Sequence, residues 1–104
     1  MSLRDLKIKT NVVKRYMKEL KSYDVELVNQ QERISKLIKS GADDADVRKQ
    51  KEVLEESVQM IPEVKRRLAT AYQELRTLIT DPQYNGTNEL EEAQKVLDDE
   101  PDNQ

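Results

Sequence analysis

The sequence predicts an all-α fold: an antiparallel three-helix bundle with a coiled-coil-like seam, two long helices and a shorter C-terminal helix. Apolar residues recur every seven positions over two long segments, and this spacing is typical of helices that pack at a shallow angle. Ala, Glu, Lys, Leu and Arg supply 46 of the 104 residues, which is the composition of long helices. The chain has 2 Gly and lacks Phe and Trp, so a compact sheet protein is disfavoured.

The two long helices are expected over residues 3–39 and 44–79. Ser2 and Asp5 have the spacing of a capping box at the start of the first helix. Gly41 stands just past its end, where a left-handed residue is favoured, and so short a connection requires an antiparallel hairpin. The seam is expected to hold two heptad series, the residues three places beyond each member, and a few flanking residues that widen it. The series are Leu6, Val13, Leu20, Leu27 and Ile34, then Val47, Leu54, Ile61, Leu68 and Leu75, and the flanking residues are Val12, Met17, Val58, Tyr72 and Ile79.

A shorter third helix is expected over residues 88–99, with Asn88 and Glu91 as its capping pair. Residues 1–21 hold seven basic and two acidic side chains, whereas residues 81–104 hold eight acidic and one basic. The third helix should therefore lie against the start of the first helix and cover only that end of the seam. Such charge complementarity sets orientation more than it adds stability.

Pro62 stands in the middle of the expected second helix, directly after Ile61 of the seam. A proline inside a helix removes a backbone hydrogen bond and costs roughly 3 kcal/mol. Its position predicts that Pro62 faces solvent and bends the helix towards its neighbours. The bend either lets a long helix follow a tapering bundle or shapes a face for a partner, and both interpretations stay open. The basic residues Lys65, Arg66 and Arg67 are likewise either a solvated face or part of a binding surface.

The composition offers little chemistry beyond packing. Cys and His are absent, so neither an enzyme activity nor a cofactor is expected. Asp44 and Asp46 match the start of a calcium loop, but Lys49 stands where that loop requires Gly. A net charge of −3 disfavours nucleic-acid binding, and no apolar run approaches the ~20 residues of a membrane span. A cytoplasmic protein with one domain over 1–104 and a disordered acidic end at 100–104 is expected.

One half of the predicted seam is polar. Gln30, Gln50 and Ser57 occupy seam positions there, and the third helix is too short to reach them, since 12 helical residues span only about 18 Å. This half is either a weak, solvated part of the hairpin or a place where another protein docks.

Three segments of the chain carry a family resemblance: LKIKTNVVKRYMKEL at 6–20, EVLEESVQMIPEVKRRLATAYQEL at 52–75 and EEAQKVLD at 91–98. They resemble the corresponding segments of the tubulin-folding cofactor A family, also called tubulin-specific chaperone A. The blocks KIKT-x-VVKR and ES-x-x-MIP are the specific part of this resemblance, which covers nearly the whole chain. The sequence departs from the family pattern mainly in the connection 80–88 and in its last six residues.

The resemblance implies a three-helix bundle that captures β-tubulin folding intermediates after the cytosolic chaperonin and passes them on toward the αβ-tubulin heterodimer, without nucleotide. It implies binding through helices rather than loops, in the cytoplasm and in association with the cytoskeleton. The implied partners are β-tubulin and other tubulin-folding cofactors. Within the matching segments, the positions selected for binding are Lys14, Arg15, Lys18, Glu63, Arg66, Arg67 and Gln73, with Pro62 as a structural residue.

Two other functions fit a helical protein of this size. A coiled-coil scaffold or homodimerising adaptor would pair its seam with a second copy and show a mass near twice 12.2 kDa. An RNA-binding helical module would lose affinity steeply as the salt concentration rises. We expect instead a monomer that binds neither nucleic acid nor membranes.

Overall fold

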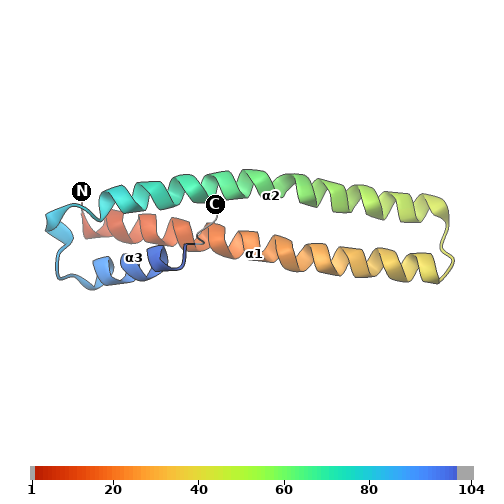
Figure 1. Ribbon diagram of the computed structural model, residues 1–104, viewed down its shortest axis with the longest axis horizontal. Helices are drawn as coiled ribbons and strands as arrows, with labels where there is room; N and C mark the ends of the chain where they lie inside the picture. The colour runs from red at the N-terminus through yellow and green to blue at the C-terminus, as the bar shows by residue number, and fades with distance from the viewer. Residues whose placement is uncertain (1, 101–104) are drawn as a thin grey trace. The chain divides into compact units, whose positions relative to one another are not determined.

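The computed structural model describes residues 2–100 and contains three α-helices and one short 3-10 helix (Figure 1). The elements are α1 (Leu3–Lys39), α2 (Asp44–Leu78), η1 (Pro82–Tyr84) and α3 (Asn88–Asp98). No strand occurs between residues 2 and 100, so the predicted all-α class is confirmed. α2 and α3 each end one residue earlier than expected, and η1 was not predicted.

The chain divides into two compact units, and α1 and α2 each contribute to both. Unit 1 comprises Met1–Lys18 and Lys65–Gln104, and unit 2 comprises Glu19–Val64. Helices η1 and α3 therefore belong to unit 1. The expectation of a single domain stays a prediction, and the expected disorder at 100–104 falls, apart from Glu100, outside the described residues.

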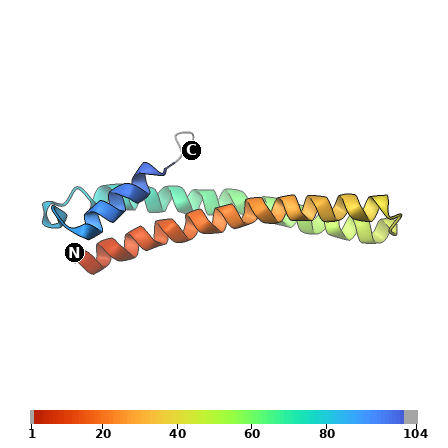
Figure 2. The same cartoon turned by 90° about the horizontal axis from the view of Figure 1, so that it is seen from below.

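In unit 1, α3 lies beside the first turns of α1 and the last turns of α2 (Figures 1 and 2). Its buried residues follow helical spacing and face the seam, as predicted. Each large apolar side chain that is removed from water here contributes about 1.5–3 kcal/mol. The core of unit 1 consists of Leu6 and Val13 of α1, Leu68, Ala71, Tyr72 and Leu75 of α2, Tyr84 of η1, and Leu90, Ala93 and Val96 of α3.

The N-terminus of α1 is held by two sets of hydrogen bonds. The predicted capping box is present, because the Ser2 Oγ accepts from the Asp5 N–H (3.3 Å) and the Asp5 carboxylate accepts from the Ser2 N–H (2.9 Å). The buried Tyr84 adds a second anchor, since its hydroxyl donates to the Ser2 carbonyl (3.1 Å). η1 supplies this tyrosine, with Asp81 as its N-cap and Pro82 at its first position.

The predicted cap of α3 is wrong by one residue. The N-cap is Thr87, whose Oγ1 accepts from the Leu90 N–H (3.1 Å), and Asn88 is already helical. Thr87 has extended backbone angles, which an N-cap requires. Gly86 precedes it with a φ of 78°, a left-handed conformation that glycine adopts without strain. The turn at Gly86 therefore decides which side chain caps the helix.

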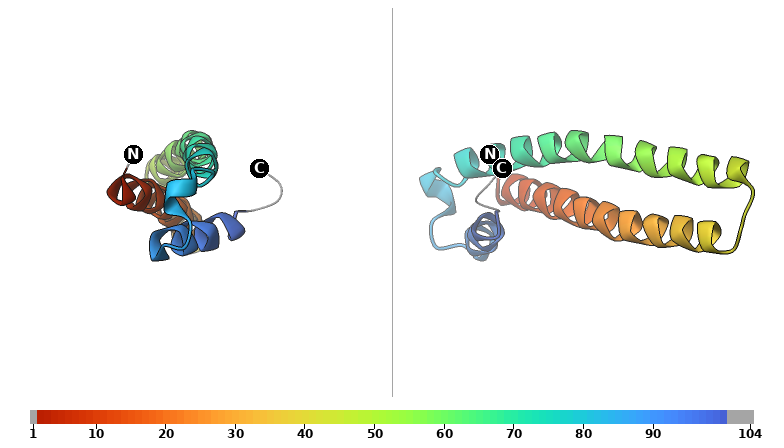
Figure 3. Two further views of the ribbon diagram at one scale, coloured as in Figure 1. Left: turned by 90° about the vertical axis from the view of Figure 1, so that its left-hand side faces the viewer. Right: turned by 45° about the vertical axis from the view of Figure 1, so that its right-hand side comes forward.

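In unit 2, α1 and α2 run antiparallel and are joined by a tight turn (Figure 3). Gly41 has a φ of 75°, as predicted for the residue past the helix end. The Gly41 N–H donates to the Ile38 carbonyl (3.2 Å) and the Ala42 N–H donates to the Leu37 carbonyl (3.0 Å). These two bonds form a Schellman motif, which satisfies the last carbonyl groups of α1.

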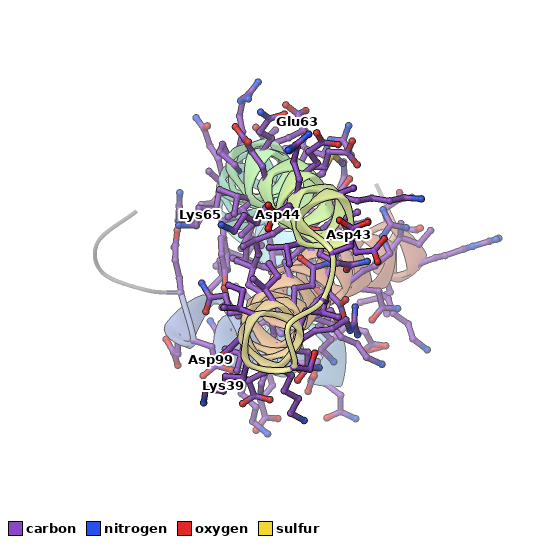
Figure 4. All side chains as sticks on the ribbon, turned by 90° about the vertical axis from the view of Figure 1, so that its right-hand side faces the viewer. Lys39, Asp43, Asp44, Glu63, Lys65 and Asp99 are labelled. Atoms are coloured by element: carbon purple, nitrogen blue, oxygen red, sulfur yellow. The ribbon has the colours of Figure 1, made fainter. Side chains whose placement is uncertain are left out.

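The start of α2 follows directly from this turn. Figure 4 views the hairpin end-on, with Lys39 at the end of α1 and Asp43 and Asp44 where α2 begins. The Asp43 carbonyl accepts from the Asp46 N–H (3.0 Å) and the Val47 N–H (3.1 Å). Acidic residues in the first turn of α2 and basic residues in the last turn of α1 complement the helix dipoles.

The predicted heptad register is confirmed, because all twenty seam positions are buried or half-buried. One prediction at the flank of the seam is wrong. Val58 was expected to widen the seam, but it is 48% exposed. It belongs to unit 2, which contains no third helix to cover that flank of α2.

Pro62 lies inside α2, which continues through it as a helix. Its side chain is exposed, so the prediction that Pro62 faces solvent is confirmed. The adjacent seam residues Ile61 and Val64 are half-buried and buried, respectively. The bend that Pro62 was expected to produce stays a prediction.

Candidate partner-binding surface

Three of the predicted binding residues, Lys14, Arg15 and Lys18, lie exposed on α1 in unit 1. Lys14 forms an ion pair with Glu92 of α3. The Arg15 guanidinium lies 5.1 Å from the centre of the Tyr16 ring, which is within the range of a cation–π interaction. Two of these three cations therefore already have a contact inside unit 1.

The other four predicted residues lie on α2. Arg66, Arg67 and Gln73 are exposed in unit 1, whereas Glu63 is half-buried and belongs to unit 2. Six of the seven predicted residues thus occur in one compact unit. Their role in binding stays a prediction.

Ion pairs connect the helices of unit 1. Lys9 and Glu74 approach to 2.8 Å, Lys14 pairs with Glu92, and Arg76 pairs with Glu100. The hydrogen bond and the charge of Lys14 lower the pKa of the Glu92 carboxyl below its usual value. These side chains are partly solvent-accessible, so each pair stabilises the fold only weakly. The Lys14–Glu92 pair joins the acidic α3 to the basic start of α1, as the charge distribution predicted.

The surface of unit 1 has two shallow hollows. The first, of about 830 Å³, lies at the end of α2 and includes Lys9, Gln73, Leu78 and Pro82. The second, of about 320 Å³, lies between α1 and α3 around the Lys14–Glu92 pair. Neither contains a nucleophile paired with a base, which a hydrolytic or transfer site requires.

Neither a metal site nor a membrane span was found in the described chain. Across residues 2–100, no three His, Cys, Asp or Glu side chains gather closely enough to hold an ion. None of the helices in this range combines the length and apolar character that crossing a membrane would take.

A feature that the sequence reasoning missed lies in unit 2, where large apolar side chains are exposed. Six of the eight such residues in the described chain belong to this unit. Heptad assignment did not find them because they lie outside the two seam positions. The six are Val25, Val28, Ile38, Val53, Val58 and Met60.

Comparison with known proteins identifies the family. Residues 1–97 match the family described as Tubulin binding cofactor A. The chain belongs to this family. Tubulin-specific chaperone A of Homo sapiens is 42% identical over 97 residues, which cover 92% of this chain and 90% of the human protein.

Solved structures of cofactor A proteins have the same fold. The crystal structure of tubulin folding cofactor A from Arabidopsis thaliana superposes with a TM-score of 0.83 at 35% identity, over 93% of this chain and 92% of the plant chain. The structure of human tubulin chaperone cofactor A gives a TM-score of 0.76 at 39% identity, over 92% and 94% of the two chains. The cofactor A family consists of tubulin-folding chaperones and not of enzymes.

Proposed function

We propose that this protein captures β-tubulin folding intermediates after the cytosolic chaperonin and passes them on toward the αβ-tubulin heterodimer, without using a nucleotide. Membership of the cofactor A family, which extends over residues 1–97, carries this proposal. Relatives that share about 40% of their residues with this chain are named tubulin-specific chaperones. Other tubulin-folding cofactors are proposed as further partners, and the cytoplasm and cytoskeleton as the location.

The exposed helix surfaces suit a protein that holds a client. Lys14, Arg15 and Lys18 follow one another within two turns of α1, and Arg66 and Arg67 are exposed on α2 in the same unit. Tubulin is acidic, so cations on this surface favour encounter and orientation. A client that is still folding needs an open surface rather than an enclosed pocket, and helices supply one.

Charge reversal at Arg66 tests this surface. Arg66 is exposed, and interactions of exposed charges contribute little to stability, so Arg66→Glu should change thermal melting only slightly. If Arg66 contacts tubulin, capture of β-tubulin should weaken about tenfold, which corresponds to about 1.4 kcal/mol. The matched control is Arg33→Glu, which makes the same charge change at an exposed position of unit 2 and should capture normally.

The measurement is capture of labelled β-tubulin released from the chaperonin, with α-tubulin as the comparison client. Capture of β-tubulin in preference to α-tubulin supports the proposed function. If the wild-type protein captures neither, the proposed function is wrong. If Arg66→Glu captures as well as Arg33→Glu, then Arg66 does not belong to the binding surface.

A further inference from the structure

Unit 2 contains a groove with an apolar rim. It has a volume of about 500 Å³ and is lined by Tyr23 of α1 and by five residues of α2. Glu56, Ser57 and Met60 follow Val53 by three, four and seven positions. These four residues therefore lie on one face of α2. The apolar members Val53 and Met60 are 37% and 47% exposed. The α2 residues of the groove are Val53, Glu56, Ser57, Gln59 and Met60.

The seam beside this groove is polar. Gln30 is 5% exposed, and its Nε2 donates to the Ser57 Oγ (3.3 Å) and to the Glu26 carboxylate (3.2 Å). The Gln30 Oε1 is buried and has no hydrogen-bond partner among residues 2–100. Gln30 and Ser57 thus pair with each other at this level of the seam, while Val53 and Met60 on its flank stay exposed.

The charge around the groove is negative. Glu56 lines it, and the exposed Glu26 accepts a hydrogen bond from Gln30, which also donates to the groove residue Ser57. Unit 2 as a whole has 11 acidic and 7 basic residues. A partner segment that matches this surface must therefore combine apolar anchors with positive charge.

We propose that this groove binds an amphipathic α-helix of a partner protein whose apolar face is flanked by Lys or Arg. Its apolar side chains lie against Tyr23, Val53 and Met60, and its cations lie against Glu56 and Glu26. Methionine and tyrosine suit this contact, because a flexible thioether adapts to different apolar shapes and a ring offers its face to a cation. The binding mode is that of a helix in a groove. The proposal does not require the partner to be tubulin.

The three methionines of the chain, Met1, Met17 and Met60, make a direct test possible. With ¹³C-labelled methionine methyl groups, each residue reports separately in an NMR titration. The probe is a synthetic helical peptide with Leu on one face and Lys along its flanks, and the comparison peptide replaces every Lys by Glu. Saturable movement of the Met60 signal by the Lys peptide, with Met17 unmoved and the Glu peptide inactive, supports the proposal.

Substitutions separate the groove from general attraction to an acidic protein. Val53→Asp and Glu56→Lys should each weaken peptide binding at least tenfold, as the Met60 signal reports, while the circular dichroism spectrum stays that of the wild type. Val25→Asp is the matched control, because Val25 is 55% exposed in unit 2 but does not line the groove, and it should bind as the wild type does.

Four results would overturn the proposal. The first is equal binding of the Glu peptide, the second is a shift of Met17 rather than Met60, and the third is unchanged binding by both groove variants. A Met60 signal that moves with protein concentration alone would also overturn it, because a second copy of this chain would then occupy the groove.

Discussion

Two tyrosines of unit 1 are fully buried, and they differ in what their hydroxyl groups contact. The Tyr84 hydroxyl donates to the Ser2 carbonyl (3.1 Å), whereas the Tyr72 hydroxyl has no hydrogen-bond partner among residues 2–100. Burial raises the pKa of both hydroxyls, and the nearby carboxylates of Glu100 and Asp99 raise that of Tyr72 further. A buried polar group without a partner loses its hydration and gains nothing in return.

The same substitution should therefore have different effects at these two sites. Tyr84→Phe removes the hydrogen bond that anchors the start of α1 and should lower the melting temperature by several degrees. Tyr72→Phe removes an unpaired hydroxyl and should leave the melting temperature unchanged or raise it. Thermal unfolding followed by circular dichroism measures both. An equal loss in the two variants would show that the Tyr72 hydroxyl is paired in solution.

Pro62 and Pro82 offer a second matched pair. Pro62 lies inside α2, where its ring removes a hydrogen bond to the Val58 carbonyl. Pro82 is the first residue of η1, where no backbone N–H is required and its fixed φ is favourable. A proline thus destabilises one helix and supports another.

Replacement by alanine should accordingly have opposite signs at the two prolines. Pro62→Ala should raise the free energy of unfolding by about 1–3 kcal/mol, since it restores a donor and relieves a clash. Pro82→Ala should lower it by about 0.4–1 kcal/mol, because the unfolded chain gains freedom. Urea unfolding measures both values. If Pro62→Ala is no more stable than the wild type, the surrounding structure already compensates for the proline.

At the scale of elements, α3 depends on its neighbours for its stability. Its 11 residues are too few for a helix that is stable by itself in water. Leu90, Ala93 and Val96 bury its apolar face in unit 1. The Lys14–Glu92 pair is exposed and mainly sets the orientation of the helix.

The contribution of the Lys14–Glu92 pair should depend on pH. The pKa of the Glu92 carboxyl is lowered in the folded protein. The ion pair therefore stabilises the fold fully at a pH above the ordinary carboxyl pKa, and this stabilisation is lost as the pH falls through the lowered pKa of the folded state. Glu92→Gln should melt slightly earlier than the wild type at pH 7, and this difference should shrink as the pH falls below the ordinary carboxyl pKa and through the lowered pKa of Glu92. A difference that does not change with pH would mean that Glu92 acts through packing or neutral hydrogen bonds instead.

At the scale of the whole molecule, oligomeric state depends on whether apolar seam residues need a second copy to cover them, and in unit 1 the chain itself covers them. Leu6, Val13, Leu68 and Leu75 are at most 2% exposed without any second copy. We therefore expect a monomer, with a mass near 12.2 kDa in light scattering at low and high protein concentration. A mass of twice that value, together with no capture of tubulin, would favour the homodimerising scaffold instead.

The sequence by itself determined the helices and their register. Heptad spacing, the capping box at Ser2 and Asp5, and the turn at Gly41 are all local properties, so they can be recognised without knowing the rest of the fold. The position of Pro62 relative to Ile61 was enough to place the proline in solvent. The family blocks around Lys14 and Pro62 were enough to indicate cofactor A, but not which exposed residues bind.

The tertiary structure decided which flanks of the seam are covered. Val58 and Tyr72 occupy the same heptad position two heptads apart, and both were expected to widen the seam. Tyr72 is completely buried in unit 1, which contains α3, whereas Val58 is 48% exposed in unit 2, which has no third helix. Periodicity shows which way a side chain points, but only the packing of another element decides whether water reaches it. For the same physical reason, the groove at Met60 became visible only in three dimensions.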